Sequence, residues 1–235
     1  MKKSMIALAI AAASATASAE LSSTVAVVSD YTFNGVSQTD SGPALQASLD
    51  YGHESGAYVG TWASNVDFGE NEDTNLEWDF YVGHYAALTS AANVDYGIAY
   101  YTYHGDDDFS EDYAYGEVYS KFDVSSDMGT SELNLWYAWD YFGTEAGHYI
   151  VQVAHTLEVA ENHNVRVSVD QSTTTDDEKW QWFGEDSYIH YKAAYQTSLE
   201  GFDIEVAYEN TNIDEDLTDN ADGRVVAGIS RTFAF

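Results

Sequence analysis

The chain ends in the stretch Gly223-Arg224-Val225-Val226-Ala227-Gly228-Ile229-Ser230-Arg231-Thr232-Phe233-Ala234-Phe235. Apolar residues alternate there with small or polar ones, which predicts a β-strand with one apolar face. In a membrane barrel the last strand must pair with the first, because no strand edge can remain in lipid. A terminal aromatic ring then lies at the boundary between membrane and water. The alternative is an ordinary edge strand that ends in phenylalanine, and the rest of the chain must decide.

The start of the chain has the pattern of a secretory signal peptide. Lys2 and Lys3 precede an apolar run, and Ala17-Ser18-Ala19 has the form of a cleavage site, so residues 1–19 are expected to be removed. This leaves one domain, 20–235. The whole chain has 235 residues, a net charge of −32 and no cysteine. The charge argues against nucleic acid as a partner, and the lack of cysteine excludes a disulfide framework.

The same alternation recurs along the mature chain without helical periodicity. It predicts about twelve strands, an even number, as in single-chain bacterial barrels, at 23–33, 44–51, 57–68, 76–88, 94–104, 113–124, 132–141, 148–157, 165–171, 187–199, 202–209 and 223–235. Short connections alternate with longer acidic ones. If both chain ends lie in the periplasm, every short turn is periplasmic and every longer loop extracellular. A soluble sandwich has no reason for this sorting, so we expect an all-β, antiparallel transmembrane barrel.

Alternation also assigns faces to the side chains. Within 57–68 the larger residues Tyr58, Trp62 and Phe68 are assigned to the lipid face. Phe68 and Tyr141 are expected in an aromatic girdle at the outer membrane boundary. Strict alternation from the C-terminus points Arg231 at lipid, so either it reaches the interface or a bulge turns it inward.

Several stretches resemble the opening of the TorF family of porins, which are proteobacterial outer-membrane proteins. They are Ser29–Thr39, Pro43-Ala44, Asp50–Gly56 and Gly60–Phe68. Asn34 departs from the family pattern, which usually has arginine there. The resemblance implies a location in the outer membrane of a Gram-negative bacterium, with lipid and lipopolysaccharide as neighbours. The ending on Phe233 and Phe235 resembles the barrel-closing signal that is read by the barrel assembly machinery.

The predicted inner face carries more carboxylates than cations. The candidate lumen charges are Asp79, Glu117, Asp123, Glu132, Glu205, Lys121, Lys192 and Arg166. Carboxylates in a narrow pore of low dielectric raise the local cation concentration. The pattern therefore favours a porin-like channel for passive diffusion of small solutes that prefers cations. The alternative is a set of salt bridges and solvated carboxylates that only keep the interior polar.

Tyrosines share this inner face, and Tyr81, Tyr85, Tyr101 and Tyr119 are the candidate lumen aromatics. Such rings either line a path for sugars or nucleosides, or fill the barrel. Twelve strands lie between the packed and the open classes of barrel, so a narrow, partly occluded path is favoured. A non-conducting structural or surface-interaction barrel stays as the alternative.

The sequence contains few residues in patterns typical of a catalytic site or a cofactor-binding site. His155, Asn164 and Ser168 are the only set that suggests a barrel hydrolase, and no nucleophile motif accompanies them. The acidic loop segments 106–112 and 214–222 lack the spacing of a calcium-binding EF-hand loop. We therefore expect no enzyme, no cofactor and no specific metal site.

Overall fold

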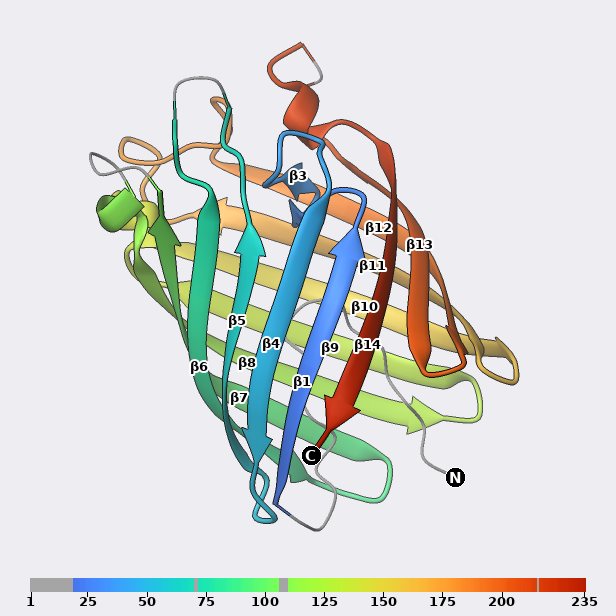
Figure 1. Cartoon of the computed structure of the whole chain (residues 1–235). Helices are drawn as coiled ribbons and strands as arrows, with labels where there is room; N and C mark the ends of the chain where they lie inside the picture. The colour runs from blue at the N-terminus through green and yellow to red at the C-terminus, as the bar shows by residue number, and fades with distance from the viewer. Residues whose placement is uncertain (1–18, 70–71, 106–109, 215) are drawn as a thin grey trace.

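Twelve strands form a closed antiparallel barrel in the computed structural model (Figure 1). The structure describes residues 19–69, 72–105, 110–214 and 216–235, so residues 1–18 of the predicted signal peptide lie outside it. The barrel strands are β1 (Glu20–Val28), β4 (Ala44–Gly52), β5 (Ala57–Asn65), β6 (Leu76–Ala87), β7 (Ala92–His104), β8 (Tyr115–Ser126), β9 (Gly129–Ala138), β10 (His148–Ala160), β11 (His163–Thr174), β12 (Ser187–Leu199), β13 (Phe202–Thr211) and β14 (Arg224–Ala234). The predicted fold class is confirmed.

The C-terminal stretch closes the barrel. β14 pairs with β1 from Ser22 opposite Ala234 to Val28 opposite Gly228. Beyond the last pair, the backbone N–H of Phe235 donates to the carbonyl of Leu21 at 2.9 Å. In Figure 1 the blue first strand lies beside the red last one. No strand edge is therefore left in the wall, as a barrel in lipid requires.

The two rims differ. One, which we call the turn rim, carries the short turns and the C-terminus, at the bottom of Figure 1. The opposite one, the loop rim, carries the longer connections with the hairpin β2 (Thr32–Phe33) and β3 (Val36–Ser37) and the 3-10 helices η1 (Ser110–Tyr113), η2 (Tyr141–Gly143) and η3 (Asp219–Ala221). In the described part of the chain, no helix is long and apolar enough to cross a membrane.

The outer face of the wall is apolar on every strand. Exposed side chains of this face are Val27, Leu45, Val59, Phe80, Ile98, Val118, Leu133, Val151, Val169, Ile189, Val206 and Ile229. Such a continuous apolar band around a barrel is typical of contact with lipid.

The face prediction for 57–68 is wrong. Tyr58 is 7% exposed and points inward, whereas its neighbour Val59 is 52% exposed. Apolar residues occupy both faces of β5, so polarity alone does not distinguish them. The tyrosine turns inward because its hydroxyl finds a hydrogen-bond partner inside, Asp95 at 2.6 Å. Trp62 shares the inner face and packs edge-on against Tyr31.

Arg231 points outward, as strict alternation predicts, and no bulge interrupts the pairing of β14 with β1 around it. Its guanidinium lies 5.0 Å from the ring centre of Phe202 and 5.3 Å from that of Phe233. These rings lie near the turn rim, where a long cationic side chain can keep its charge in water.

Candidate functional site

The candidate site is the barrel lumen, whose wall has two chemically different halves. From β4 to β8, tyrosine hydroxyls donate to carboxylates. Tyr81 donates to Asp50, and Tyr58 donates to Asp95 and lies 2.5 Å from the hydroxyl of Tyr119. Nearer the loop rim, two further tyrosines donate in the same way: Tyr101 to Glu117 at 2.8 Å and Tyr103 to Glu77 at 3.2 Å. These bonds hold phenol rings and carboxylates in fixed positions on the wall.

Inward-facing glycines make room for three of these rings. A Cβ at Gly60 would lie 2.4 Å from the ring of Tyr81. One at Gly83 would lie 2.4 Å from Tyr58, and one at Gly97 would lie 2.4 Å from the hydroxyl of Tyr119. The rings thus lie over bare backbone, which is a common reason for glycine inside a strand. They therefore occupy less of the lumen than they would if a side chain lay beneath them.

From β9 to β14 the wall is built from ion pairs instead. Arg166 contacts Glu132 at 2.9 Å, and Lys192 contacts Glu205 at 2.8 Å. At the loop rim, Arg224 contacts Asp30 at 2.6 Å. Buried charges that are paired in this way cost less than isolated ones.

A buried histidine completes this half. His190 lies between two carboxylates, with its Nδ1 2.9 Å from Asp170 and its Nε2 3.6 Å from Glu209. Lys192 reaches the same Glu209 at 3.9 Å. Sequence reasoning missed this cluster, although His190, Lys192 and Glu209 occupy inward positions on neighbouring strands.

The lumen as a whole carries an excess of negative charge. Inward carboxylates of the described residues are Asp30, Asp50, Glu77, Asp79, Asp95, Glu117, Asp123, Glu132, Asp170, Asp203, Glu205 and Glu209, and inward cations are Lys121, Arg166, Lys192 and Arg224. Glu77, Asp79 and Glu117 are each at most 3% exposed. Each also has a buried oxygen without a hydrogen-bond partner.

The other predicted lumen residues lie nearer the turn rim. Asp123 accepts a hydrogen bond from Asn93 at 2.8 Å, and Tyr85 is half-buried on the inner face of β6. The Nζ atom of Lys121 lies 5.1 Å from the ring centre of Tyr119 and 5.7 Å from that of Trp136. Within the described residues Lys121 has no carboxylate within 4.0 Å, although Asp95 lies opposite it on the neighbouring strand.

The loop rim is closed by one apolar cluster, which we call the outer plug. Each connection on this rim supplies at least one side chain to it: Val36, Phe68, Tyr113, Tyr141, Phe142, Trp180, Trp182, Ile213 and Ala221. The cluster continues onto the inward tyrosines of the wall. Phe142 and Trp180 stack with ring planes 5° apart and centres 6.2 Å apart. The mouth on this side is thus filled with aromatic side chains.

The outer plug shows that two predictions are wrong, and the sequence analysis did not predict the plug itself. Phe68 and Tyr141 belong to it, not to an outer aromatic girdle, because Tyr141 is only 4% exposed and Phe68 packs against Tyr103, Tyr113 and Phe142. Burial, with the nearby Tyr188 and Glu117, raises the pKa of Tyr141 well above its usual value, so this phenol stays neutral. The sequence signal for the plug is the presence of large aromatic residues inside acidic loops, which indicates burial but not where the rings are buried.

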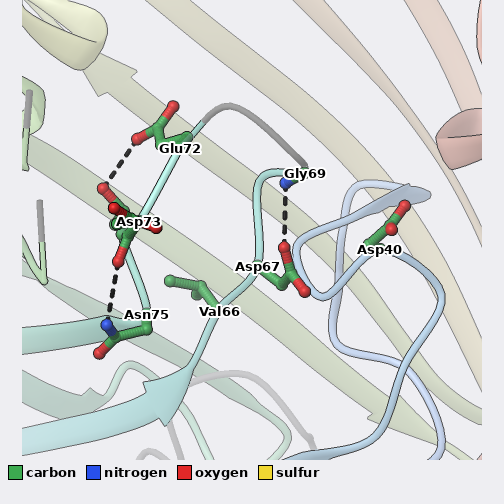
Figure 2. Close-up of a pocket in the computed structure, with 8 residues that line it drawn as sticks. Asp40, Val66, Asp67, Gly69, Glu72, Asp73 and Asn75 are labelled. Carbon is green, nitrogen blue, oxygen red and sulfur yellow. Dashed lines mark hydrogen bonds between the residues drawn. The ribbon is translucent and has the colours of Figure 1, made fainter.

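An acidic hollow of about 430 Å³ lies at the loop rim between the 29–43 and 66–75 connections. Figure 2 shows Asp40, Asp67 and Glu72 around it. Asp67 accepts from the backbone of Gly69, and Glu72 accepts from the hydroxyls of Thr74 and Tyr113. Among the residues that the structure describes, no three acidic, histidine or cysteine side chains come together as a metal site.

The residues considered for a hydrolase do not meet. Ser168 lies opposite Ala154 and faces the lumen, whereas His155 points to the outer face of the same wall. His155 instead contacts the hydroxyl of Ser131 and the carbonyl of Met128, both at 3.0 Å. The wall separates the two side chains, so they cannot act as nucleophile and base.

Similar folds occur among solved outer-membrane porins and channels. The KdgM porin in complex with disordered oligogalacturonate matches with a TM-score of 0.59 and 7% identity, over 91% of this chain and 99% of that one. The NanC porin gives 0.59 and 10% identity, over 91% and 98%. The COG4313 outer membrane channel from Pseudomonas putida F1 gives 0.55 and 9% identity, over 93% and 96%. At these identities the likeness shows the fold alone.

Sequence comparison gives the family. No curated protein matches this chain. The porin-like architecture agrees with what the TorF resemblance implies, while membership of TorF itself stays a prediction. A family profile described as "Bacterial protein of unknown function (Gcw_chp)" matches residues 12–233, which is nearly the whole chain, and the chain therefore belongs to the Gcw_chp family.

Proposed function

We propose that this protein is an outer-membrane channel for passive diffusion of small solutes, with a preference for cations. The observation that carries the proposal is the unequal charge of the lumen. Inward carboxylates outnumber inward cations, and Glu77, Asp79 and Glu117 have no cation paired with them among the described residues. A wall that served only to close the barrel would gain nothing from buried carboxyl groups that lack a cation partner.

The membrane location rests on the outer face. Apolar side chains are exposed on all the barrel strands, and among the described strand residues Arg231, near the turn rim, is the one cation on this face. Lipid and lipopolysaccharide then surround the wall, and the barrel assembly machinery reads Phe233 and Phe235. We place the turn rim in the periplasm and the loop rim outside the cell, because short periplasmic turns and longer outer loops are usual in these barrels. Export depends on the predicted signal peptide.

The solute class follows from the charge of the lumen. Oligogalacturonate, with which the KdgM porin was solved, is a polyanion. The lumen of the present chain is acidic, so an anionic oligosaccharide would meet repulsion along the β4–β8 half of the wall. Small cationic or neutral solutes fit this interior better.

The test is a reversal-potential measurement in planar bilayers under a gradient of potassium chloride. A cation preference should be stronger at low salt, because the screening length falls from about 10 Å at 0.1 M to about 3 Å at 1 M. Replacing Asp123→Asn and Asp203→Asn should shift the reversal potential toward zero. The matched control is Asp214→Asn in an exposed outer loop, which should shift it less. A channel that prefers chloride would overturn the cation assignment.

The outer plug favours a second candidate, a barrel that does not conduct and serves a structural or surface-interaction role. Apolar side chains from every loop-rim connection, most of them aromatic, fill the mouth, and inward tyrosines continue below them. If no current appears at any salt or voltage, even in variants that open the plug, this second reading replaces the channel.

A further inference from the structure

Two of the loops that form the outer plug are bound to each other. They are residues 139–147 and 175–186, which we call the flap. The backbone N–H of Thr175 donates to the carbonyl of Gly147 at 2.8 Å, and the N–H of Gly147 donates to the hydroxyl of Thr175 at 2.9 Å. Lys179 contacts the carboxylate of Glu145 at 3.0 Å in open solvent. The stacked rings of Phe142 and Trp180 join the same two loops. The flap is therefore one unit.

The flap stores backbone strain. Phe142, Glu145 and Phe183 have φ angles of +53°, +60° and +53°, in the left-handed region that favours glycine. Phe142 stays there while its ring is packed inside the plug against Tyr103 and Tyr115. Strained backbone of this kind is maintained only by surrounding contacts and is frequent in segments that move.

With the flap in this position, some polar groups are buried away from water and have no hydrogen-bond partner. The indole Nε1 of Trp180 and both ring nitrogens of His148 are buried without a hydrogen-bond partner. His148 is 1% exposed and is enclosed by the rings of Tyr141 at 4.3 Å and Trp182 at 4.9 Å. A buried polar group without a partner destabilises the state in which it is buried. Lifting the flap would give all three nitrogens water, so these groups favour the open state.

The flap covers a carboxyl group of the lumen, that of Glu117, which has no cation partner among the described residues. Glu117 on β8 lies opposite Ala138 on β9, and Ala138 lies opposite His148 on β10, directly beneath the flap. Glu117 is 1% exposed and one of its carboxylate oxygens has no partner. Water and cations would therefore reach this carboxylate from the loop rim when the flap moves away.

We propose that the flap is a gate on the loop-rim mouth, closed in this structure, whose opening joins the acidic lumen to the outside. Apolar stacking between Phe142, Trp180 and the wall tyrosines holds it shut. Backbone strain and the unpartnered nitrogens of Trp180 and His148 oppose closure. The inference rests on the proposed channel function for its purpose, while the movement can be measured without any current.

The movement is tested with a single thiol. The chain has no cysteine, so Ala138→Cys introduces one reporter beneath the flap, at a position that is 0% exposed. The protein is purified in detergent and labelled with a charged methanethiosulfonate reagent. In this background Trp180→Ala should label at least about tenfold faster than the parent, because a tenfold change in the opening equilibrium needs only about 1.4 kcal/mol. The matched control is Phe183→Ala, an exposed aromatic of the same loop, which should label like the parent.

Conductance of the same substitutions without the reporter separates the two proposals. A raised open probability in Trp180→Ala, but not in Phe183→Ala, supports both gate and channel. Faster labelling without any current supports the gate and overturns the channel. Equal labelling and equal current in all proteins overturn the gate and leave the channel standing. Heat-modifiable gel migration confirms folding, and Phe142→Ala, which removes the ring but keeps a side chain at the left-handed φ angle, replaces Trp180→Ala if that variant does not fold.

Discussion

Arg224 should stabilise the seam at which the barrel closes. It lies at the start of β14, and its guanidinium donates to Asp30 at 2.6 Å and Ser41 at 3.2 Å. It also donates to the carbonyls of Asp219 at 2.6 Å and Asp222 at 3.0 Å. One side chain thus joins the end of β1 to two loops. We predict that Arg224→Met destabilises the barrel more than any other change of a single lumen cation to methionine.

The magnitude follows from these bonds. A hydrogen bond between charged groups contributes about 1.5–3 kcal/mol, and the bonds to loop carbonyls add about 1 kcal/mol in total because they are partly exposed. Asp30 keeps only the hydroxyls of Ser37 and Thr39, and its second oxygen loses its partner. The free energy of unfolding should fall by about 3 kcal/mol, which is about a hundredfold in the folded-to-unfolded ratio.

The assay is urea unfolding in detergent, followed by the gel mobility of folded and unfolded forms. The control is Arg231→Met on the same strand, where only exposed contacts with aromatic rings are lost, at a cost of about 0.5–1 kcal/mol. Adding Asp30→Asn to Arg224→Met should restore part of the loss, because the unpaired charge is gone. Equal stability of the two arginine variants would refute the reasoning.

Two further outcomes are expected. Deleting Phe235 should reduce the amount of heat-modifiable barrel in the outer membrane, since its N–H bond to Leu21 and its terminal ring are lost; normal insertion would contradict the role given to the C-terminal stretch. A peptide tag inserted within 173–186 should be reachable by protease on intact cells, whereas one within 125–130 should not, and the reverse result would invert the proposed orientation while leaving the barrel intact.

The wall could be predicted because a barrel strand obeys a simple rule. Side chains alternate between lipid and lumen, so apolar periodicity fixes both the strand and its face. The rule fails where both faces carry apolar residues. On β5, polarity alone does not show whether Tyr58 or Val59 points to the lipid. It is the inner hydrogen-bond partner Asp95, distant in sequence, that decides. The direction of the β5 side chains therefore depends on the pairing of the strands, and local polarity alone does not determine it.

The first predicted strand was too long for a similar reason. The stretch 29–33 alternates well, but the strand ends at Val28. Asp30 turns inward to meet Ser37, Thr39 and Arg224, the last of them far along the chain. A local signal was present in Asn34-Gly35, whose φ angles of +48° and +82° suit the tight hairpin of β2 and β3. The predicted strand 23–33 stopped before this turn, but it joined β1 to β2 across residues 29–31, where the chain leaves the barrel wall.

The plug could not be predicted by the same means, because loops have no period. Each loop-rim connection supplies only one or two of its residues, such as Phe142 or Trp182, and an isolated aromatic in an acidic loop has no preferred direction. These loop aromatics can pack against one another only after the strands have placed every loop at one rim. There the nearest volume that excludes water is the mouth of the lumen, so the hydrophobic effect draws the rings into it and onto Tyr115 and Tyr188. Closure of the mouth is thus a property of the assembled rim, and for the same reason its reopening depends on how tightly a few loop aromatics hold together.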